Sequence, residues 1–243
     1  MITTILFDLD GTLLSMDQEE FIQYYFKGLC QKMAPHGYDP KDLTAQVWNG
    51  TKAMVTNRSD ETNETVFWKH MTGHYGQKIL DDMPVFEEFY NREFQQIADY
   101  CPPKEQALKA IEKLKGNYRL VLATNPIFPS MATFSRMKWA GLNEEDFELV
   151  TTYENSSRSK PNPEYFLEIL QKLNLKPEEC LMVGNDVDED GAALQAGIPL
   201  FLIEDHLINR AGRDLSDLPH GTFEDLPAWV EMMAAKKASE EQD

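Results

Sequence analysis

The sequence is short of cysteine, of basic residues and of long hydrophobic runs, and each shortage excludes a class of protein. Its three cysteines, Cys30, Cys101 and Cys180, form no C-x-x-C pattern, so neither a disulfide framework nor a zinc site is indicated. No stretch approaches the roughly 18 consecutive apolar residues of a membrane span. Asp8 and Asp10 interrupt the one early apolar run, so we expect no signal peptide and a cytoplasmic protein.

Acidic residues far outnumber basic ones. The 243 residues include 23 Lys and Arg against 41 Asp and Glu, a formal net charge of −18. A protein of this sign repels polyanions, so we expect neither nucleic acid nor an anionic membrane as a partner. An anionic substrate would need a local positive site or a metal ion to draw it in. The pattern does not indicate an oligomeric state.

A short run of strand-forming residues that ends in two carboxylates stands at the start of the chain. Residues 3–7 (TTILF) are typical of a strand buried on both faces, as in a parallel sheet. Asp8 and Asp10 follow, and Gly11 permits the turn that the chain must then make. Carboxylates this close repel each other, so a bound cation is one reason to place them there. An ordinary Asp-Gly turn is the alternative.

Two prolines, Pro102 and Pro103, divide the rest of the chain. Residues 15–101 carry aromatic residues at helical spacing, which predicts an all-helical segment with these side chains in its core. Beyond the prolines, apolar segments alternate with helical patterns, which predicts an α/β fold with a parallel sheet flanked by helices. The expected strands lie near 118–123, 147–151, 181–183 and 200–203, and the expected helices over 105–115, 130–140, 163–173 and 189–196.

This pattern predicts a Rossmann-like core made of residues 1–14 and 102–234, with the helical segment 15–101 inserted after the first strand. The polar tail, residues 235–243, is expected to fray. Because ligands of such sheets bind at the carboxyl ends of the strands, the polar residues that follow each expected strand are the candidate site.

Two candidate segments lie in the second half of the chain. Thr124 and Asn125 come directly after the strand near 118–123, where a hydroxyl and backbone N–H groups can hold a phosphate oxygen. Taken alone, Thr-Asn-Pro is simply a turn. Lys160 precedes Pro161 and a helix that starts at Pro163. Its ammonium could neutralise the carboxylates and a phosphate, and the alternative is a surface lysine.

The last candidate is the acidic segment 184–191 (GNDVDEDG), which follows the strand near 181–183. Asp186, Asp188 and Asp190 suit a hard cation with oxygen ligands. With Gly191 they match the first half of a calcium-binding loop. The loop's last ligand should be Glu, but Gly197 stands there, and residues 192–196 are typical of a helix. We therefore reject a calcium site.

The set of motifs resembles that of the haloacid dehalogenase-like (HAD) hydrolase superfamily, in its phosphatase-type members with a helical type-I cap. The matching segments, in the family's order, are DLDGTL at 8–13, Thr124, KPNP at 160–163 and GNDVDED at 184–190. The resemblance implies that Asp8 is the nucleophile and Asp10 the general acid and base. It also implies that residues 15–101 form the cap that selects the leaving group.

The resemblance further implies a phosphate site at Thr124, Asn125 and Lys160, with Lys160 also catalytic. It implies Mg²⁺ held by Asp8, by the backbone carbonyl of Asp10 and by the fourth motif. There Asn185 stands where the common form has Asp, so Asp186 is the favoured ligand and Asn185 the alternative.

Two residues have supporting roles in this reading, and together the motifs define an activity. Thr12 would position Asp10, and Asp190 would bind the metal through water or hold Lys160. The implied activity is Mg²⁺-dependent hydrolysis of a small phosphorylated metabolite through an aspartyl-phosphate intermediate.

Four other functions stay open on the same fold. A haloacid dehalogenase is disfavoured by Asp10, since its relatives lack the second Asp of the first motif. A phosphonate hydrolase needs a cap lysine, and nothing singles out Lys27, Lys32 or Lys52. A phosphoglucomutase shares the motifs. A catalytically silent binding protein is hinted at by Asn185 alone. The motifs do not indicate a particular substrate.

Overall fold

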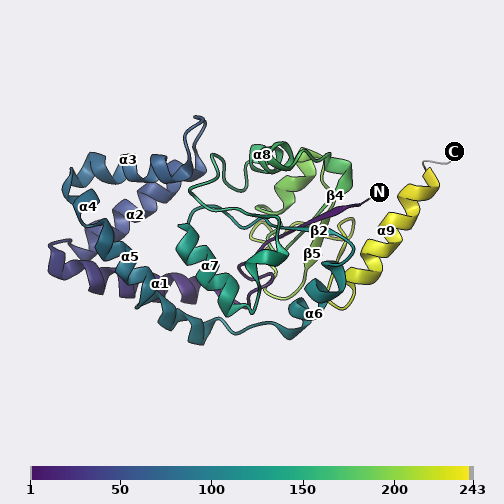
Figure 1. Ribbon diagram of the computed structural model, residues 1–243, viewed down its shortest axis with the longest axis horizontal. Coiled ribbons are helices and arrows are strands. Elements are labelled where there is room, and N and C mark those ends of the chain that lie inside the picture. Colours follow the sequence, from purple (N-terminus) through teal and green to yellow (C-terminus); the bar gives the residue numbers. More distant parts are fainter. Residues whose placement is uncertain (1, 241–243) are drawn as a thin grey trace.

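A parallel sheet with helices around it forms the larger part of the molecule, at the right of Figure 1. The computed structural model describes residues 2–240, without the side chains of residues 234–240. Within this part of the chain, six strands lie in the order β3-β2-β1-β4-β5-β6, and every neighbouring pair is parallel. The strands are β1 (Thr4–Phe7), β2 (Arg119–Leu122), β3 (Leu149–Val150), β4 (Cys180–Gly184), β5 (Leu200–Ile203) and β6 (His220–Gly221). The expected α/β fold with a parallel sheet is confirmed.

Strand β1 lies inside the sheet, between β2 and β4, and carries apolar side chains on both faces. Ile5, Leu6 and Phe7 are fully buried. Ile5 and Phe7 pack into the core under α6 (Glu105–Leu114), α7 (Ser130–Trp139) and α9 (Leu226–Glu240), whereas Leu6 packs under α8 (Pro163–Leu173) and the 3₁₀ helix η5 (Gly191–Ala196). This alternation is what a strand covered by helices on both faces requires.

From Gln18 to Tyr100, before the two prolines, the chain is mostly helical. The helices are α1 (Gln18–Met33), η1 (Ala34–His36), α2 (Pro40–Val55), α3 (Asn63–Tyr75), α4 (Lys78–Asp81), α5 (Met83–Asn91) and η2 (Phe94–Tyr100). Helices α1–α5 lie together to one side of the sheet, at the left of Figure 1. The chain leaves the sheet and returns at adjacent points, because Leu14 and Pro103 pair in an isolated antiparallel bridge.

The structure differs from the local expectations in four places. The helix expected over 189–196 begins only at Gly191 and is a 3₁₀ helix, because the Asp190 carboxylate accepts hydrogen bonds from the backbone N–H groups of Asn185 and Asp186 and keeps the preceding residues in a loop. Strand β6 and helix α9 were not expected. The backbone of α9 continues through Glu240, and the rest of the tail that we expected to fray, 241–243, lies outside the described residues.

None of the helices in the described part of the chain combines the length and the apolar character needed to cross a bilayer.

Helix α8 offers a direct test of the core. Phe166 is fully buried against the sheet, whereas its neighbour Leu167 is 48% exposed. We expect Phe166→Ala to lower the free energy of unfolding by about 3–5 kcal/mol, measured by urea denaturation. Leu167→Ala is the matched control and should change it by no more than about 0.5 kcal/mol. Equal losses for the two variants would contradict this packing.

Candidate active site

Four segments that are far apart in the sequence meet at the carboxyl edge of the sheet. The register pairs Phe7 with Leu122 and with Val183, so the residue after β1 lies between the ends of β2 and β4. Accordingly the Asp8 backbone N–H donates to the Val183 carbonyl over 2.9 Å. The segment before α8 reaches the same point, because the Lys160 ammonium contacts the Asp8 carboxylate.

Lys160 is the charge at the centre of this arrangement. Its side chain is 1% exposed, and its Nζ donates to Asp8 Oδ1 over 2.8 Å and to Asp190 Oδ1 over 2.6 Å. Burial disfavours its charged form, but the carboxylates of Asp190 and Asp8 outweigh this and raise the Lys160 pKa well above its usual value. Lys160 lies behind Asp8 and is not among the described residues that line the cavity in front of it.

The two carboxylates that contact Lys160 are themselves crowded. Burial raises the pKa of Asp190 to about 6, with Lys160 opposing the rise and Asp8 adding to it. The pKa of Asp8 is also raised, first by burial and then by the nearby Asp10, while Lys160 and the Thr12 hydroxyl oppose the rise. A cation near Asp8 would favour its ionised form, which is the form that a nucleophile needs.

Asp190 also shapes the acidic loop. Its Oδ2 accepts hydrogen bonds of 2.9 Å from the backbone N–H groups of both Asn185 and Asp186. This approach requires Gly184, since a Cβ there would lie 2.1 Å from Asp190 Oδ2. Of the two roles expected for Asp190, the contacts match the holding of Lys160.

Thr12 contacts a different partner from the one we expected. Its hydroxyl lies 3.1 Å from Asp8 Oδ2 and 3.0 Å from Asn185 Oδ1, and not beside the Asp10 carboxylate. The cause is the turn at Gly11, whose φ of 83° lies in the left-handed region and brings Thr12 back beneath Asp8. Thr12 thus links the nucleophile candidate to the acidic loop.

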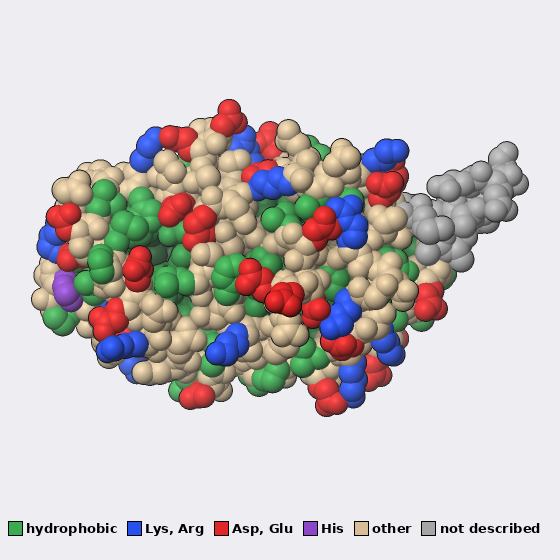
Figure 2. Space-filling model, viewed as in Figure 1, with side chains coloured by type: hydrophobic (Ala, Val, Ile, Leu, Met, Phe, Trp, Pro, Cys, Tyr) green, Lys and Arg blue, Asp and Glu red, His purple; other side chains and the backbone are tan. Residues whose placement is uncertain are grey.

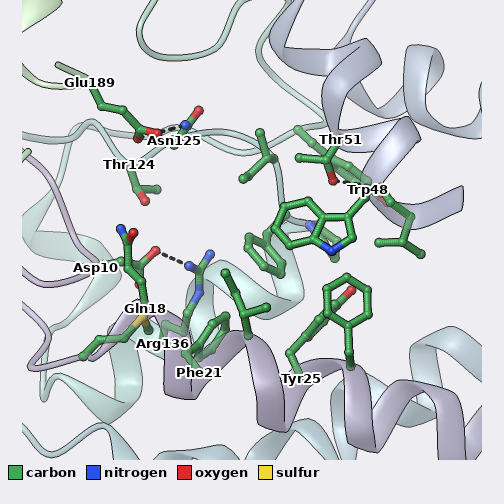
Figure 3. Close-up of a pocket in the computed structure, with 18 of the residues that line it drawn as sticks. Asp10, Gln18, Phe21, Tyr25, Trp48, Thr51, Thr124, Asn125, Arg136 and Glu189 are labelled. Atoms are coloured by element: carbon green, nitrogen blue, oxygen red, sulfur yellow. Dashed lines mark hydrogen bonds and ion pairs between the residues drawn. The ribbon is translucent and has the colours of Figure 1, made fainter. Parts of the chain in front are cut away.

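The Asp10 carboxylate pairs with Arg136, a residue that the sequence analysis missed (Figure 3). The Arg136 side chain is 1% exposed and its guanidinium carbon lies 4.5 Å from the centre of the Phe128 ring. Its Nε and Nη2 donate to the Ala132 carbonyl and the Thr133 hydroxyl one turn earlier in α7. The sequence offered one signal for Arg136, because it is an arginine at a position of α7 where helical spacing predicts a buried residue.

The acidic loop holds a second arginine that was missed. Asp186 Oδ2 pairs with Arg210 Nη1 over 2.6 Å, and Asp186 Oδ1 accepts from the N–H groups of Asp188 and Glu189. Arg210 follows β5 in an exposed segment with no sequence pattern, so nothing pointed to it. The Asn185 amide is held on both sides, by the Thr12 hydroxyl and by the carbonyl of His206 over 2.7 Å.

Thr124 and Asn125 lie at the end of β2 as expected. The Thr124 carbonyl accepts hydrogen bonds from the hydroxyls of Thr151 and Tyr165, which holds this turn in place. Asn125 Nδ2 donates to Glu189 over 3.1 Å, and burial raises the pKa of that glutamate to about 7. The buried Oδ1 of Asn125 has no hydrogen-bond partner in the described part of the chain.

The donor set suits Mg²⁺ that is completed by substrate and water. Among the side chains that the structure describes, those of residues 2–233, no three from Asp, Glu, His or Cys form a group that could hold a metal ion by themselves. Mg²⁺ commonly uses only one or two carboxylates, with phosphate oxygens and waters as its other ligands. Asp8, Asp10 and Asp186 line one cavity with Asn185, and the buried Asp10 Oδ1 has no hydrogen-bond partner within the described residues.

The cavity in front of Asp8 and Asp10 has a volume of ≈ 350 Å³ and extends from the sheet edge into the helical segment. In Figure 3, Asp10, Thr124 and Arg136 lie on one side, and Trp48 and Thr51 on the other. Several aromatic residues that we assigned to the helical core therefore also line this cavity.

Comparison with known proteins gives concordant results. Residues 2–197 match the model of the haloacid dehalogenase-like hydrolase family. Pyrophosphatase PpaX of Bacillus cereus is 25% identical over 213 residues, which cover 86% of this chain and 87% of the relative.

Solved structures agree at the level of the fold. A 2-haloacid dehalogenase from Pseudomonas syringae superimposes with a TM-score of 0.63 at 18% identity, over 96% of this chain and 99% of that one. Magnesium-bound YfnB from Bacillus subtilis superimposes with a TM-score of 0.53 at 18% identity, over 93% and 96% of the two chains.

The close approach at Gly184 can be tested against a second glycine, Gly191, at the other end of the acidic segment 184–191. We expect Gly184→Ala to lower the free energy of unfolding by about 1–3 kcal/mol, because its Cβ would displace the Asp190 carboxylate from its partners. A Cβ at Gly191 meets nothing within 4 Å, so Gly191→Ala should change stability by less than about 1 kcal/mol. Urea denaturation of both variants measures the difference, and the same effect for both would refute the crowding.

Proposed function

The chain belongs to the haloacid dehalogenase-like hydrolase family, and we propose that it is a Mg²⁺-dependent phosphatase that hydrolyses small phosphate monoesters through an aspartyl phosphate. One observation carries the proposal: Asp8 and Asp10 face one cavity, the first against an ammonium and the second against a guanidinium. The likeness to pyrophosphatase PpaX supports the hydrolysis of a phosphate bond.

Asp8 is the nucleophile in this proposal. Lys160 and Thr12 hold its two oxygens in place, so that a carboxylate oxygen can approach the phosphorus opposite the leaving alcohol. The Asp8–phosphorus bond forms as the bond from phosphorus to the alcohol oxygen breaks. Lys160 does not line the cavity, so we assign it to the nucleophile rather than to direct binding of phosphate.

Asp10 moves the protons. It donates a proton to the departing alcohol oxygen, and it then takes one from the water that cleaves the aspartyl phosphate. The Arg136 guanidinium pairs with Asp10 Oδ2 and so fixes the orientation of the carboxylate that lines the cavity. Arg136 is therefore a positioning residue for Asp10.

Thr124 and Asn125 are proposed to bind the transferred phosphoryl group, since both line the cavity beside Asp8. Asp8, the carbonyl of Asp10 and Asp186, with Asn185 as the alternative, would hold Mg²⁺. When bound, Mg²⁺ neutralises charge on the phosphate oxygens and so lowers the repulsion between phosphate and carboxylate. The helical residues 15–101 would act as the cap that covers the site and selects the leaving group.

The other functions open on this fold receive less support. For a haloacid dehalogenase, the structural likeness has only 18% identity and therefore concerns the fold alone. The second carboxylate of the first motif, Asp10, favours phosphate chemistry instead. A phosphonate hydrolase would need a lysine in the cavity, but none of the described residues that line it is a lysine. In particular, Lys32 pairs with Glu88 and Glu93.

Replacement of the nucleophile tests the proposal directly. We expect wild-type protein to release p-nitrophenol from p-nitrophenyl phosphate with Mg²⁺ and not with EDTA, and Asp8→Asn to lower kcat by about 10³-fold or more. Asp188→Asn, in the same acidic loop, is the matched control and should retain activity. Release that survives Asp8→Asn would contradict the assignment.

The pairing of Asp186 with Arg210 predicts an effect on metal affinity. The Arg210 side chain is 57% exposed, and an exposed ion pair is worth up to about 1 kcal/mol, so Arg210→Gln should tighten Mg²⁺ binding by about two- to fivefold. Arg213 pairs with Asp188 at 59% exposure, and Arg213→Gln is the control that should leave affinity unchanged. Calorimetric titration without substrate measures both, and tightening in the control alone would point to Asp188 as the ligand.

A further inference from the structure

The part of the cavity that lies inside the helical segment is walled by rings and aliphatic side chains. We call it the apolar lobe, and its main residues are Phe21, Tyr25, Val47, Trp48, Phe67 and Trp68. It is continuous with the cavity at Asp8 and Asp10. We propose that the substrates of this protein are phosphate monoesters whose leaving alcohol carries an aromatic group, and that this group fills the apolar lobe. The inference rests on the proposed phosphatase function and names its substrate class.

Two aromatic residues of the lobe, Tyr25 and Trp68, have their polar atoms bonded to neighbouring tyrosines. The hydroxyls of Tyr25 and Tyr90 lie 3.0 Å apart, and the Trp68 indole N–H donates to the Tyr153 hydroxyl over 3.3 Å. These residues therefore present ring surface to the cavity. Ring surface binds an apolar group by burial and by edge-to-face contacts.

Charge is confined to the sheet side of the cavity. None of the lining residues that α1, α2, α3 and α5 contribute within the described chain is charged. The two lining cations, Arg136 and Arg210, come from the core and are paired with Asp10 and Asp186. A second phosphate or a carboxylate on the leaving group would enter the lobe without a counter-ion, which is costly away from water.

The mouth of the lobe is exposed aromatic surface. Trp48 is 46% exposed and packs at a tilt against Phe26, with ring centres 5.5 Å apart. In Figure 2 hydrophobic side chains surround a hollow over the helices at the left of the view. Deeper in the lobe, Phe21 and Tyr25 place their rings edge-on to Phe128, 6.0 and 5.5 Å between centres. A flat ring that enters past Trp48 would meet such rings along its path.

The test compares esters of matched reactivity. The substrates are 2-(2-naphthyl)ethyl phosphate and ethyl phosphate, which both release a primary alcohol, together with pyrophosphate. With Mg²⁺ and wild-type protein, we expect kcat/KM for the naphthyl ester to exceed that for ethyl phosphate at least about tenfold, from burial of the ring. Pyrophosphate should be the poorest of the three.

Variants of α2 localise the preference. Thr51 lines the lobe, and its hydroxyl donates to the Val47 carbonyl one turn earlier. We expect Thr51→Phe to fill the lobe and bring the naphthyl-to-ethyl ratio close to one. Thr56 makes the same bond, to Lys52, but lies outside the cavity lining. Thr56→Phe is therefore the matched control and should keep the wild-type ratio.

Trp48→Ala provides a second test that does not depend on the fit of a larger side chain. The Trp48 side chain is partly exposed, so the variant should fold. Loss of the indole ring should also reduce the naphthyl-to-ethyl ratio of kcat/KM.

The outcomes separate the two proposals. Mg²⁺-dependent hydrolysis that favours ethyl phosphate or pyrophosphate, or a naphthyl preference that Thr51→Phe and Trp48→Ala both leave intact, would overturn the inference and leave the phosphatase function standing. Failure of wild-type protein to hydrolyse any of the three would overturn the inference, and failure with p-nitrophenyl phosphate as well would overturn both.

Discussion

The ion pairs of Lys160 with Asp8 and Asp190 are the interactions on which the site depends. Three charges lie almost out of contact with solvent, and a buried carboxylate without a partner costs several kcal/mol. Lys160 makes it possible to bury Asp8 at the end of β1, and it ties the segment before α8 to the acidic loop. Asp190 then organises that loop through two backbone N–H groups, an arrangement that only a glycine at position 184 accommodates. The same contacts thus determine both local structure and chemistry.

The cavity has two chemically different ends. At the sheet, carboxylates, amides and hydroxyls surround Asp8, and Lys160 and Arg136 neutralise carboxylates that would otherwise repel an anionic substrate in a chain of net charge −18. In the helical segment, the lining is uncharged and rich in rings. A phosphate monoester has the same division into a charged and an uncharged half. This match connects the proposed chemistry to the proposed substrate class, and it places specificity in the helices inserted after β1.

Much of the sheet and its edge could be predicted from the sequence. Apolar runs predicted β1, β2, β4 and β5. Because the carboxyl ends of parallel strands lie at one edge of a sheet, Asp8, Thr124 and the acidic loop were predicted to be neighbours. Arg136 and Arg210 could not be placed this way, because their partners are set by tertiary contacts. The role of Thr12 depended on the left-handed turn at Gly11. Helical spacing predicted that most aromatic residues of the helical segment face inward, but not that their rings leave a cavity between them.

The most direct test of the account is to trap the covalent intermediate. p-Nitrophenolate leaves without a proton, so Asp10→Asn should still transfer the phosphoryl group from p-nitrophenyl phosphate to Asp8, but it should hydrolyse the aspartyl phosphate slowly. Acid quenching during turnover, followed by mass spectrometry of the peptides, should find one added phosphoryl group on Asp8. The double variant with Asp8→Asn should carry none. A phosphoryl group on another residue, or release of p-nitrophenol with no phosphorylated protein at any time in the first turnover, would contradict the account.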